Sequence, residues 1–256
     1  MIPGLVSVTL RSLPVGEIIA LVGKAGLCCI EWGGDVHVPH GNLAVARETA
    51  QRMKDTGLRT ACYGSYYRAG EERVSFGAVL ETAVALGSPK IRIWAGTRNA
   101  EETSPEEWQR IADDIRRVTE QAAGEGITVV LEFHQNTLTN TAAAARRLLK
   151  ALQPAGTGLI WQANSRLAVE ENLAELAEVQ PWVHHVHCGY SAPPLLQRSP
   201  LAEGRTVWRR YLEYLRAIPS AREILLEFVR GHSPEQVLED ARELVCLCKE
   251  AVQVNP

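Results

Sequence analysis

Two apolar, strand-like segments of this chain each carry a single glutamate. Glu132 lies in TVVLEFH and Glu227 lies in EILLEFV. A lone carboxylate is almost never buried unless it is paired or bound to a cation. Two carboxylates that converge also repel each other unless a cation or a shared proton lies between them. The two glutamates therefore indicate a catalytic or metal-binding site. The alternative is that each one pairs with an arginine or with backbone amides inside the fold.

The elements that must position these glutamates form a repeating pattern. Short apolar segments alternate with longer amphipathic ones about eight times, which is typical of βα units around a parallel sheet. The expected strands are roughly 4–11, 28–33, 59–67, 90–95, 127–134, 158–163, 183–189 and 223–229. The expected helices are near 14–26, 42–57, 74–87, 104–125, 139–153, 168–180, 207–218 and 233–252. Ser104 and Ser233, each followed by proline and an acidic residue, mark two helix starts. The pattern predicts the α/β class and a single (β/α)8 TIM barrel over 1–256.

A barrel of this kind predicts where the chemistry lies, because its active site forms at the C-terminal ends of the strands. Four polar residues stand at such ends on the last four expected strands: Glu132, Gln162, His187 and Glu227. Two carboxylates, one imidazole and one amide oxygen make an oxygen-rich ligand set. We therefore expect one divalent metal ion, with Mn²⁺ favoured and Mg²⁺, Co²⁺ or Zn²⁺ as alternatives. Taken alone, a histidine on a strand is more often a core residue than a ligand.

Composition narrows the classes of partner. The net charge of -3 and the mixed charges give no basic stripe for nucleic acid. The 6 cysteines have no Cys-x-x-Cys spacing, so reduced thiols are expected. No apolar segment approaches the roughly 20 residues that a membrane span needs, and the N-terminus lacks the pattern of a secretory leader. These features predict a cytoplasmic protein with no nucleic-acid or membrane partner. The oligomeric state is left open, with a homo-oligomer among the options.

Four segments carry a resemblance to a known family: VVLEFHQNTLTNT, WVHHVHCGY, PLAEGRTVWRRYLEYL and LLEFVRGHSPEQVLEDA. Over its whole length the chain resembles the xylose-isomerase-like TIM-barrel superfamily of sugar and sugar-phosphate isomerases and epimerases. In that family a glutamate, an aspartate, a histidine and a glutamate after strands five to eight hold one divalent cation. The matching positions are Glu132, Gln162, His187 and Glu227. Gln162 departs from the family aspartate, and its neutral amide implies weaker cation binding. One alternative is that Asn164 or a water molecule takes the place of Gln162 as a ligand, and another is that the cation site has been lost.

The resemblance implies proton abstraction next to a carbonyl group, with the cation polarising the substrate oxygens. Glu132 and Glu227 would be the acid and base as well as ligands. The predicted function is a metal-dependent isomerase or epimerase of a small-molecule carbohydrate, sugar phosphate or keto acid. Two other functions stay open. One is a related barrel that binds a sugar-like ligand without metal chemistry after the change at Gln162. The other is a DNA-repair endonuclease of this barrel class, which the small number of histidines disfavours.

Further residues near the same strand ends are candidates for substrate binding. These are Glu31, His37, Tyr63, Arg92, His134, His185 and Arg230. Arginine is included because a guanidinium binds carboxylate or phosphate with two parallel hydrogen bonds. The alternatives are that Glu31 pairs with Arg92 inside the barrel and that the histidines are core or solvated residues. The 190–206 connection is expected to lack regular structure, and its 193–196 tip (PPLL) is expected to form an apolar flap or to pack against a neighbouring subunit.

Overall fold

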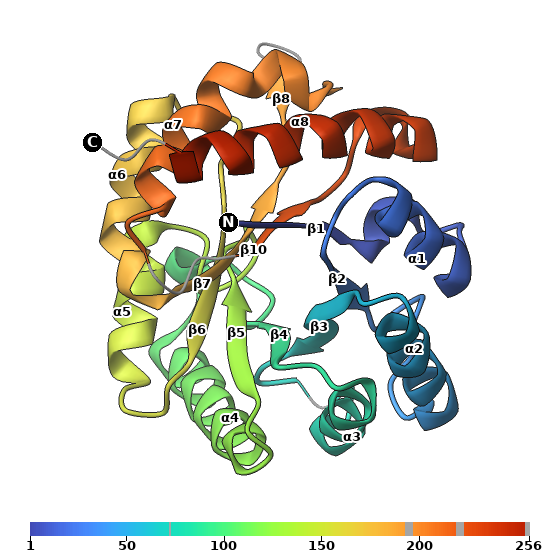
Figure 1. The fold of residues 1–256 in the computed structure, drawn as a ribbon. Coiled ribbons are helices and arrows are strands. Elements are labelled where there is room, and N and C mark those ends of the chain that lie inside the picture. Colours follow the sequence, from blue (N-terminus) through green and yellow to red (C-terminus); the bar gives the residue numbers. More distant parts are fainter. Residues whose placement is uncertain (72, 193–196, 219–222, 254–256) are drawn as a thin grey trace.

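Within the described residues, eight parallel strands close into a barrel and eight α-helices lie around it. Figure 1 shows the strands at the centre and the helices outside them. The computed structural model describes residues 1–71, 73–192, 197–218 and 223–253. Neighbouring strands follow the order β1-β10-β7-β6-β5-β4-β3-β2, so each strand pairs with its neighbours along the chain and β10 closes the ring onto β1. The predicted (β/α)8 TIM barrel is confirmed.

The elements agree closely with the expected ranges. The barrel strands are β1 Ile2–Val6, β2 Cys29–Gly33, β3 Arg59–Arg68, β4 Lys90–Trp94, β5 Thr128–Glu132, β6 Gly158–Gln162, β7 Val183–Cys188 and β10 Glu223–Leu226. The helices are α1 Val15–Lys24, α2 Leu43–Asp55, α3 Phe76–Leu86, α4 Pro105–Gly124, α5 Ala142–Ala151, α6 Val169–Val179, α7 Arg205–Leu215 and α8 Pro234–Gln253. Short 3-10 turns are η1 Ser7–Leu10, η2 Ala100–Glu102, η3 Gln180–Trp182, η4 Leu201–Gly204 and η5 Arg230–His232. Both predicted serine caps are present, since Ser104 accepts from Glu107 N and Ser233 accepts from Gln236 N, each at 3.2 Å.

The first expected strand is too long. It ends at Val6, and Ser7–Leu10 turn into η1. The hydroxyl groups of this turn replace strand pairing by accepting backbone N–H groups from neighbouring loops and strands: Gly33 N donates to Ser7 Oγ at 2.9 Å and Phe228 N donates to Thr9 Oγ1 at 3.1 Å. Serine and threonine hydroxyls compete with regular backbone pairing in this way. The turn brings the end of β1 against the ends of β2 and β10.

Apolar side chains fill the space on both sides of the strands. Between the strands and the helices lies the main apolar core, which includes Leu5, Ile30 and Trp32. Inside the ring, Cys62, Val130 and Ile160 form a small apolar cluster. Charged side chains lie at both ends of the strands, with Lys90 and Glu223 at the first residues of β4 and β10 and the candidate site at the opposite ends. Filled layers of this kind are usual inside TIM barrels.

Strand β3 is irregular, and this changes which residues face the barrel interior. Its pairing with β2 shifts between Ile30 and Glu31, and its pairing with β4 shifts between Gly64 and Tyr67. Such bulges break the alternation of side chains. As a result Tyr63, opposite Trp32, packs in the outer core rather than in the interior.

The 190–206 connection contains regular structure, contrary to expectation. Ser191–Ala192 (β8) pairs antiparallel with Gln197–Arg198 (β9), and η4 follows. The two prolines at 193 and 194 do not prevent this pairing, because they are not among the paired residues. The expected apolar flap at 193–196 lies outside the described residues.

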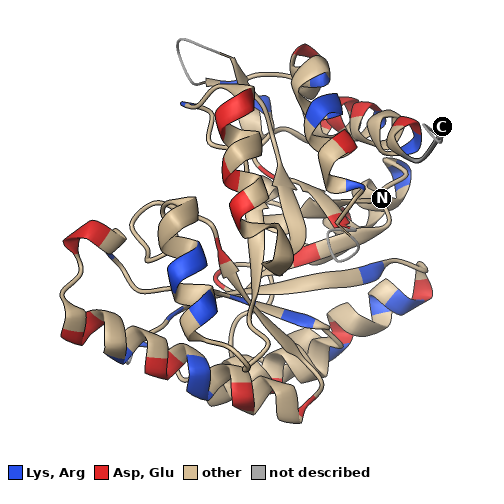
Figure 2. Cartoon of the chain, turned by 90° about the vertical axis from the view of Figure 1, so that its left-hand side faces the viewer, with Lys and Arg blue, Asp and Glu red and all other residues tan. Residues whose placement is uncertain are grey.

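Surface charge is mixed. Acidic and basic residues are interspersed along the helices (Figure 2). Within the described ranges, no helix combines the length and the apolar character that crossing a bilayer would require.

Candidate functional site

Five charged side chains from five strands meet at the C-terminal end of the barrel. We call them the upper cluster, and they are Glu31, Arg92, Glu132, His187 and Glu227. All are buried, with exposed fractions between 0% for Glu31 and 6% for Glu227. All the parallel strands end at this side of the closed barrel, so residues up to 156 positions apart in sequence come into contact there. The structure thus brings together the two glutamates singled out by sequence, with His187 beside them.

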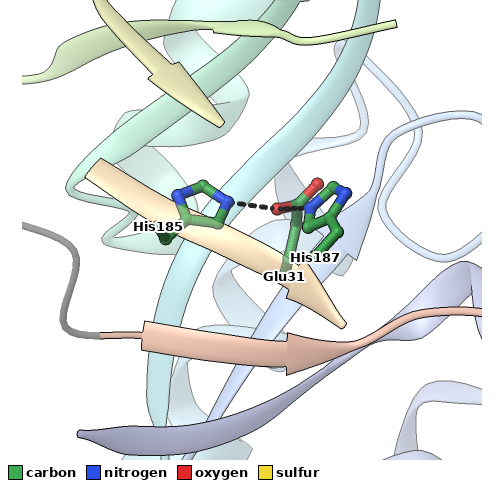
Figure 3. Close-up of side chains that lie close together, drawn as sticks. All are labelled: Glu31, His185 and His187. Carbon is green, nitrogen blue, oxygen red and sulfur yellow. Dashed lines mark hydrogen bonds and ion pairs between the residues drawn. The ribbon is translucent and has the colours of Figure 1, made fainter. Parts of the chain in front are cut away.

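His187 is oriented by a carboxylate on the far side of its ring. Its Nε2 lies 3.1 Å from Glu31 Oε2, and the same oxygen lies 2.9 Å from Nε2 of His185 (Figure 3). The other ring nitrogen, Nδ1, is buried, forms no hydrogen bond within the described residues, and lies 3.4 Å from Glu227 Oε2. A metal-binding histidine usually donates its second N–H to a carboxylate, which fixes the tautomer. Glu31 therefore leaves the lone pair of Nδ1 available on the side of Glu132 and Glu227.

Electrostatics favour a positive charge at this nitrogen. Burial lowers the pKa of His187, but the carboxylates of Glu227 and Glu31 outweigh it and hold the pKa well above the usual range. Burial raises the pKa of Glu31, yet His187, His185 and Arg92 together bring it well below the usual range. The pKa of Glu227 is lowered in the same way, since His187 and Arg92 outweigh burial. The carboxylates thus attract a positive charge at Nδ1, which a proton or a metal ion can supply.

Glu132 is held by two donors on one oxygen. Arg92 Nη1 donates to Oε2 at 2.7 Å, and the indole Nε1 of Trp94 donates to the same atom at 2.6 Å. No hydrogen bond to Oε1 of Glu132 is present in the described part of the chain. Arg92 also reaches Glu31, with Nε 3.5 Å from Oε1, so the alternative of a Glu31–Arg92 pair inside the barrel is present in the structure. One oxygen of Glu132 thus remains for a ligand or a proton.

The backbone around Arg92 is shaped to admit its side chain. A Cβ atom on Gly64 would stand 2.8 Å from Arg92 Nη2 and 3.0 Å from Glu31 Oε1. Just beyond it, Tyr66 has φ 55°, a left-handed conformation that is strained for an aromatic residue. Its ring lies 4.6 Å from Arg92 Cζ. Strained residues concentrate at functional sites, and this one lies directly over the upper cluster.

Two sets of side chains have the spacing to hold a metal ion. One is Glu31, His185 and His187, and the other is Glu132, His187 and Glu227, each with ligand atoms within 4.8 Å of one another. In the first set the imidazole nitrogens already bond to Glu31 Oε2. In the second, the buried Nδ1 of His187 forms no hydrogen bond, lies 3.4 Å from Glu227 Oε2 and is close to the carboxylate of Glu132. The second set therefore fits a divalent ion.

Gln162 lies next to this set. It pairs in register with His187, and its Nε2 donates to the Phe133 carbonyl at 2.8 Å. Because the amide nitrogen is engaged there, the acceptor Oε1 is the atom left for an ion or a substrate. Asn164, considered as a replacement ligand, instead accepts from Arg166 N at 3.0 Å and receives the Asn172 side chain on its carbonyl.

The predicted substrate-binding residues divide into two groups. Glu31, Arg92 and His185 are at most 2% exposed. Glu31 contacts His187 and His185, and Arg92 bonds to Glu132. The pKa of His185 is lowered to about 3 by burial and by the charge of Lys90, so its ring is neutral. His134 is half-buried and stacks on Trp94, with ring centroids 4.9 Å apart. Its Nδ1 lies 2.6 Å from the Gln135 carbonyl, which leaves Nε2 for another partner.

The other three candidates lie away from the upper cluster. Tyr63 Oη donates to the Val38 carbonyl at 2.8 Å, and its side chain packs in the outer core, opposite Trp32. His37 is 6% exposed and bonds through Nδ1 to Ser7 Oγ at 2.9 Å. Arg230 is exposed and donates to Gln236 Oε1 at 3.0 Å on α8. Substrate contact for each stays a prediction.

Two arginines at the rim were missed by sequence reasoning. Arg68 ends β3, with Cζ 3.9 Å from the Trp94 ring, and Arg198 in β9 lies with Cζ 5.6 Å from the Phe228 ring. The bulges of β3 hide Arg68 from an alternation rule. Arg198 lies in a connection that has no periodicity to read. The only available signal was the position of Arg68 at the end of an expected strand.

A cavity of about 840 Å³ lies elsewhere, between the end of β3, α3 and α4. Of its three acidic lining residues, Glu71, Glu107 and Asp114, the last accepts from Tyr67 Oη at 2.7 Å and Gly70 N at 2.8 Å and pairs with Arg117. These bonds satisfy the carboxylate. The chemistry of the upper cluster does not extend into this cavity, because none of the five cluster residues lines it.

A known protein family matches most of this chain. The family described as xylose isomerase-like TIM barrel matches residues 19–248. A curated 3-dehydroshikimate dehydratase from Bacillus anthracis is 28% identical over 104 residues, which is 38% of this chain and 35% of that protein. The match thus spans about a third of the length of that relative.

Three solved structures have the same fold. A probable 3-DHS dehydratase from Bacillus anthracis superposes with a TM-score of 0.79, at 19% identity, over 96% of this chain and 99% of that one. A D-psicose 3-epimerase gives 0.71, at 19% identity, over 98% and 99%. The IOLI protein, which was solved with a bound zinc atom, gives 0.77, at 15% identity, over 99% and 100%. At these identities the likeness concerns the fold.

Proposed function

Because the chain belongs to the xylose isomerase-like TIM barrel family, we propose that it is a metal-dependent enzyme that removes a proton next to a carbonyl group. The substrate would be a sugar, a sugar phosphate or a keto acid, and the reaction an isomerisation or epimerisation. One observation carries the proposal: Glu132, Glu227 and the Nδ1 of His187, which forms no hydrogen bond, make a buried set whose ligand atoms are within 4.8 Å of one another. A family that includes epimerases and dehydratases supports this class of chemistry.

Glu132, His187 and Glu227 would hold the ion, with Gln162 as a neutral fourth donor. When bound, a divalent ion would polarise the substrate carbonyl and stabilise negative charge on its oxygen. Glu31 would keep His187 in the required tautomer through the 3.1 Å contact. The loss of one carboxylate at Gln162 predicts weaker affinity than an aspartate would give.

The two glutamates divide the proton transfers between them. They come from β5 and from the residue after β10, so they approach a substrate from different sides of the barrel mouth. One carboxylate takes the proton from the carbon next to the carbonyl, and the other delivers a proton to the opposite face of that carbon, which gives the epimer. Delivery of the proton to the former carbonyl carbon gives the isomer: the hydroxyl on the neighbouring carbon loses its proton and becomes the new carbonyl, and the former carbonyl oxygen gains a proton and becomes a hydroxyl. Arg92 and Trp94 hold Glu132 in place for either step.

Dehydration is a second candidate, because the curated relative is a dehydratase. Elimination of water begins with the same removal of a proton next to a carbonyl group. It then requires an acid to protonate the departing hydroxyl, and the second glutamate could supply that proton. The two reactions differ in their product, since only elimination loses the mass of water.

The test is to measure the metal content of the purified protein and then to follow exchange of substrate hydrogen for solvent deuterium. The panel would contain keto sugars, hydroxy sugars and keto acids, and mass spectrometry would identify any product. We expect a bound divalent ion, and deuterium in at least one substrate. Exchange that persists unchanged in both Glu132→Gln and Glu227→Gln, or a protein that takes up no ion from excess Mn²⁺, would contradict the proposal.

A further inference from the structure

Two basic side chains at the barrel mouth lack an acidic partner. Among the described residues, every lysine and arginine is either exposed or ion-paired except Arg68 and Arg198, which are half-buried. Both lie at the end of the barrel that carries the upper cluster. Removing part of a guanidinium from water without a counter-charge is unfavourable. Their shared position therefore points to a ligand that supplies the missing negative charge.

Arg68 is the better positioned of the two. Its Cζ lies 3.9 Å from the ring of Trp94, whose indole N–H bonds to Glu132. Two acidic residues act on it electrostatically without forming an ion pair with it. Glu71 Oε2 lies 3.4 Å from the exposed Arg73 and forms no hydrogen bond, and Glu132 is bonded to Arg92 at 2.7 Å. Burial lowers the pKa of Arg68, as expected for a cation that has lost water and gained no partner. Stacking fixes the guanidinium beside the proposed base and leaves its N–H groups available.

Arg198 lies on the opposite rim. Its Cζ is 5.6 Å from the ring of Phe228, the residue after Glu227. A Cβ on Gly189 would stand 2.5 Å from its Nη1, so the guanidinium rests on bare backbone at the end of β7. The looser stacking and the two-residue strand β9 make it a weaker anchor than Arg68. Its charge still attracts anions toward the mouth.

Charge balance supports an anionic ligand. The upper cluster has three carboxylates, which Arg92 and one divalent ion would neutralise with His187 acting as a neutral ligand. Arg68 and Arg198 then remain as positive charges at the rim that form no ion pair within the described chain. A neutral sugar would leave both uncompensated, whereas an acid would compensate at least one.

We propose that the substrate of this site carries a carboxylate group, that Arg68 binds it on the face of Trp94, and that Arg198 draws it toward the mouth. The proposal rests on the proposed function and names its substrate class. A single guanidinium matches a carboxylate with two parallel hydrogen bonds. A phosphate ester is usually bound by several backbone N–H groups together with cations. Each arginine here stands alone on an aromatic ring, so the carboxylate is favoured.

Binding can be measured by titration calorimetry on the Mn²⁺-loaded protein with matched compounds. Each acid is compared with a neutral counterpart: D-glucuronate with D-glucose, D-galacturonate with D-galactose, D-gluconate with D-sorbitol, and shikimate with its methyl ester. D-glucose 6-phosphate provides the phosphate arm. We expect at least one acid to bind about tenfold more tightly than its counterpart, which corresponds to about 1.4 kcal/mol.

The variants assign that preference to residues. Arg68→Gln should bring the ratio of the two affinities close to one, and Arg68→Lys should keep part of it because the charge remains without the fork. Arg198→Gln should reduce the affinity less and should weaken its dependence on salt. The matched control is Arg59→Gln, an exposed arginine at the other end of the same strand, which should leave the ratio unchanged.

Several results would overturn the inference. These are failure of every acid to bind, equal binding of acids and their counterparts, a preference that survives Arg68→Gln in a folded protein, or an Arg68-dependent preference for the phosphate over the carboxylates. The outcome is separable from that of the proposed function. Arg68-dependent binding of an acid without deuterium exchange would contradict only the chemistry. Exchange into neutral sugars with no preference for acids would contradict only the substrate class.

Discussion

The barrel contains two buried groups of charge, at opposite ends of the same strands, and they are built differently. At the lower end Lys90 Nζ lies 3.2 Å from Glu223 Oε2, one cation with one anion. At the upper end three carboxylates share Arg92 and a histidine. Strands β4 and β10 contribute to both groups, so the same strands carry a balanced pair at one end and an unbalanced cluster at the other.

The difference shows that burial of charge is a poor sign of function by itself. A closed pair such as Lys90 and Glu223 is satisfied without a ligand and can serve the fold alone. A cluster with surplus carboxylates, in which the Nδ1 of His187 forms no hydrogen bond and lies 3.4 Å from Glu227 Oε2, attracts a further positive charge that a proton or a metal ion can supply. Perturbed groups of the second kind concentrate at functional sites. Substituting one glutamate at each end tests whether the two groups of charge have different roles.

The largest expected effect is on the proton transfer. Glu227 and Glu223 are four positions apart at the two ends of β10, so Glu227→Gln and Glu223→Gln form a matched pair. We expect Glu227→Gln to slow solvent deuterium exchange by roughly 10²–10⁴-fold, because a positioned acid or base contributes about that much. Glu223→Gln should leave the rate nearly unchanged. If both variants lose exchange equally, the distinction between the two ends is wrong.

The second prediction concerns stability, for which the substitution at the lower end is expected to have the larger effect. Lys90 is 8% exposed, so Glu223→Gln leaves a buried ammonium without a counter-charge. Breaking a buried pair in this way costs about 3 kcal/mol in the free energy of unfolding. Replacing both residues, Lys90→Met with Glu223→Leu, should recover most of the loss while deuterium exchange stays intact. Urea unfolding would measure it, and a double variant as unstable as the single one would show that the pair is not an independent unit.

The fold and the candidate ligands could be read from the sequence for a clear physical reason. Buried strands must be apolar, so a polar residue at a strand end such as Glu132 or Glu227 stands out against its neighbours. The alternation of strand and helix periods fixes the barrel, and the barrel fixes which ends converge. Local information is sufficient for both steps.

The pairing of side chains across the barrel could not be read in the same way. Glu31 is 156 positions from His187, and nothing local indicates that it orients that ring. The register shifts of β3 break the alternation of its side chains, so sequence spacing alone does not show that Tyr63 packs in the outer core or that Arg68 lies at the rim. A bulge depends on how two strands fit together, which is a tertiary property. Arg198 lies in a connection whose hairpin has only two paired residues on each side, too short to leave a pattern.

A third prediction sharpens the account of the upper cluster through Gln162. Gln162→Asp should raise Mn²⁺ affinity about tenfold, or about 1.4 kcal/mol, because it adds a charged oxygen ligand. The same change should destabilise the metal-free protein, since a further carboxylate joins three others. Thermal unfolding with and without Mn²⁺ separates the two effects, because an ion that binds only the folded state stabilises it by mass action.

Asn164→Asp is the control for that change. Asn164 lies two positions beyond Gln162 and is engaged with Arg166 N at 3.0 Å, so its replacement should not alter Mn²⁺ affinity. A gain in affinity at Asn164 and none at Gln162 would move the fourth ligand to the loop after β6. Equal effects at both positions would indicate general electrostatic attraction in place of coordination.

The smallest effect concerns pH, and it has opposite signs at the two ends. His184 lies near the lower pair, and burial together with the charge of Lys90 lowers its pKa, whereas the pKa of His187 is raised by Glu227 and Glu31 against burial. His184 is therefore neutral when folded but takes a proton on unfolding below about pH 6.5. Its contribution to stability is complete above that pH and is lost as the pH falls toward its folded pKa. His187 binds its proton in the folded state, so in the metal-free protein its contribution is complete below about pH 6.5 and is lost as the pH rises through its folded pKa.

Urea unfolding of the metal-free protein between about pH 5 and 8 would compare the two histidines, over the range in which an unperturbed imidazole titrates. His184→Gln should flatten the loss of stability on acidification, and the exposed His232→Gln should change the profile little. Glu223→Gln should steepen the loss, because Glu223 is the charge that raises the pKa of His184. His187→Gln should instead remove stability mainly on the acid side. Profiles that shift in the same direction for His184→Gln and His187→Gln would mean that both ends respond to one global charge, and the contrast between a balanced pair and an open cluster would fail.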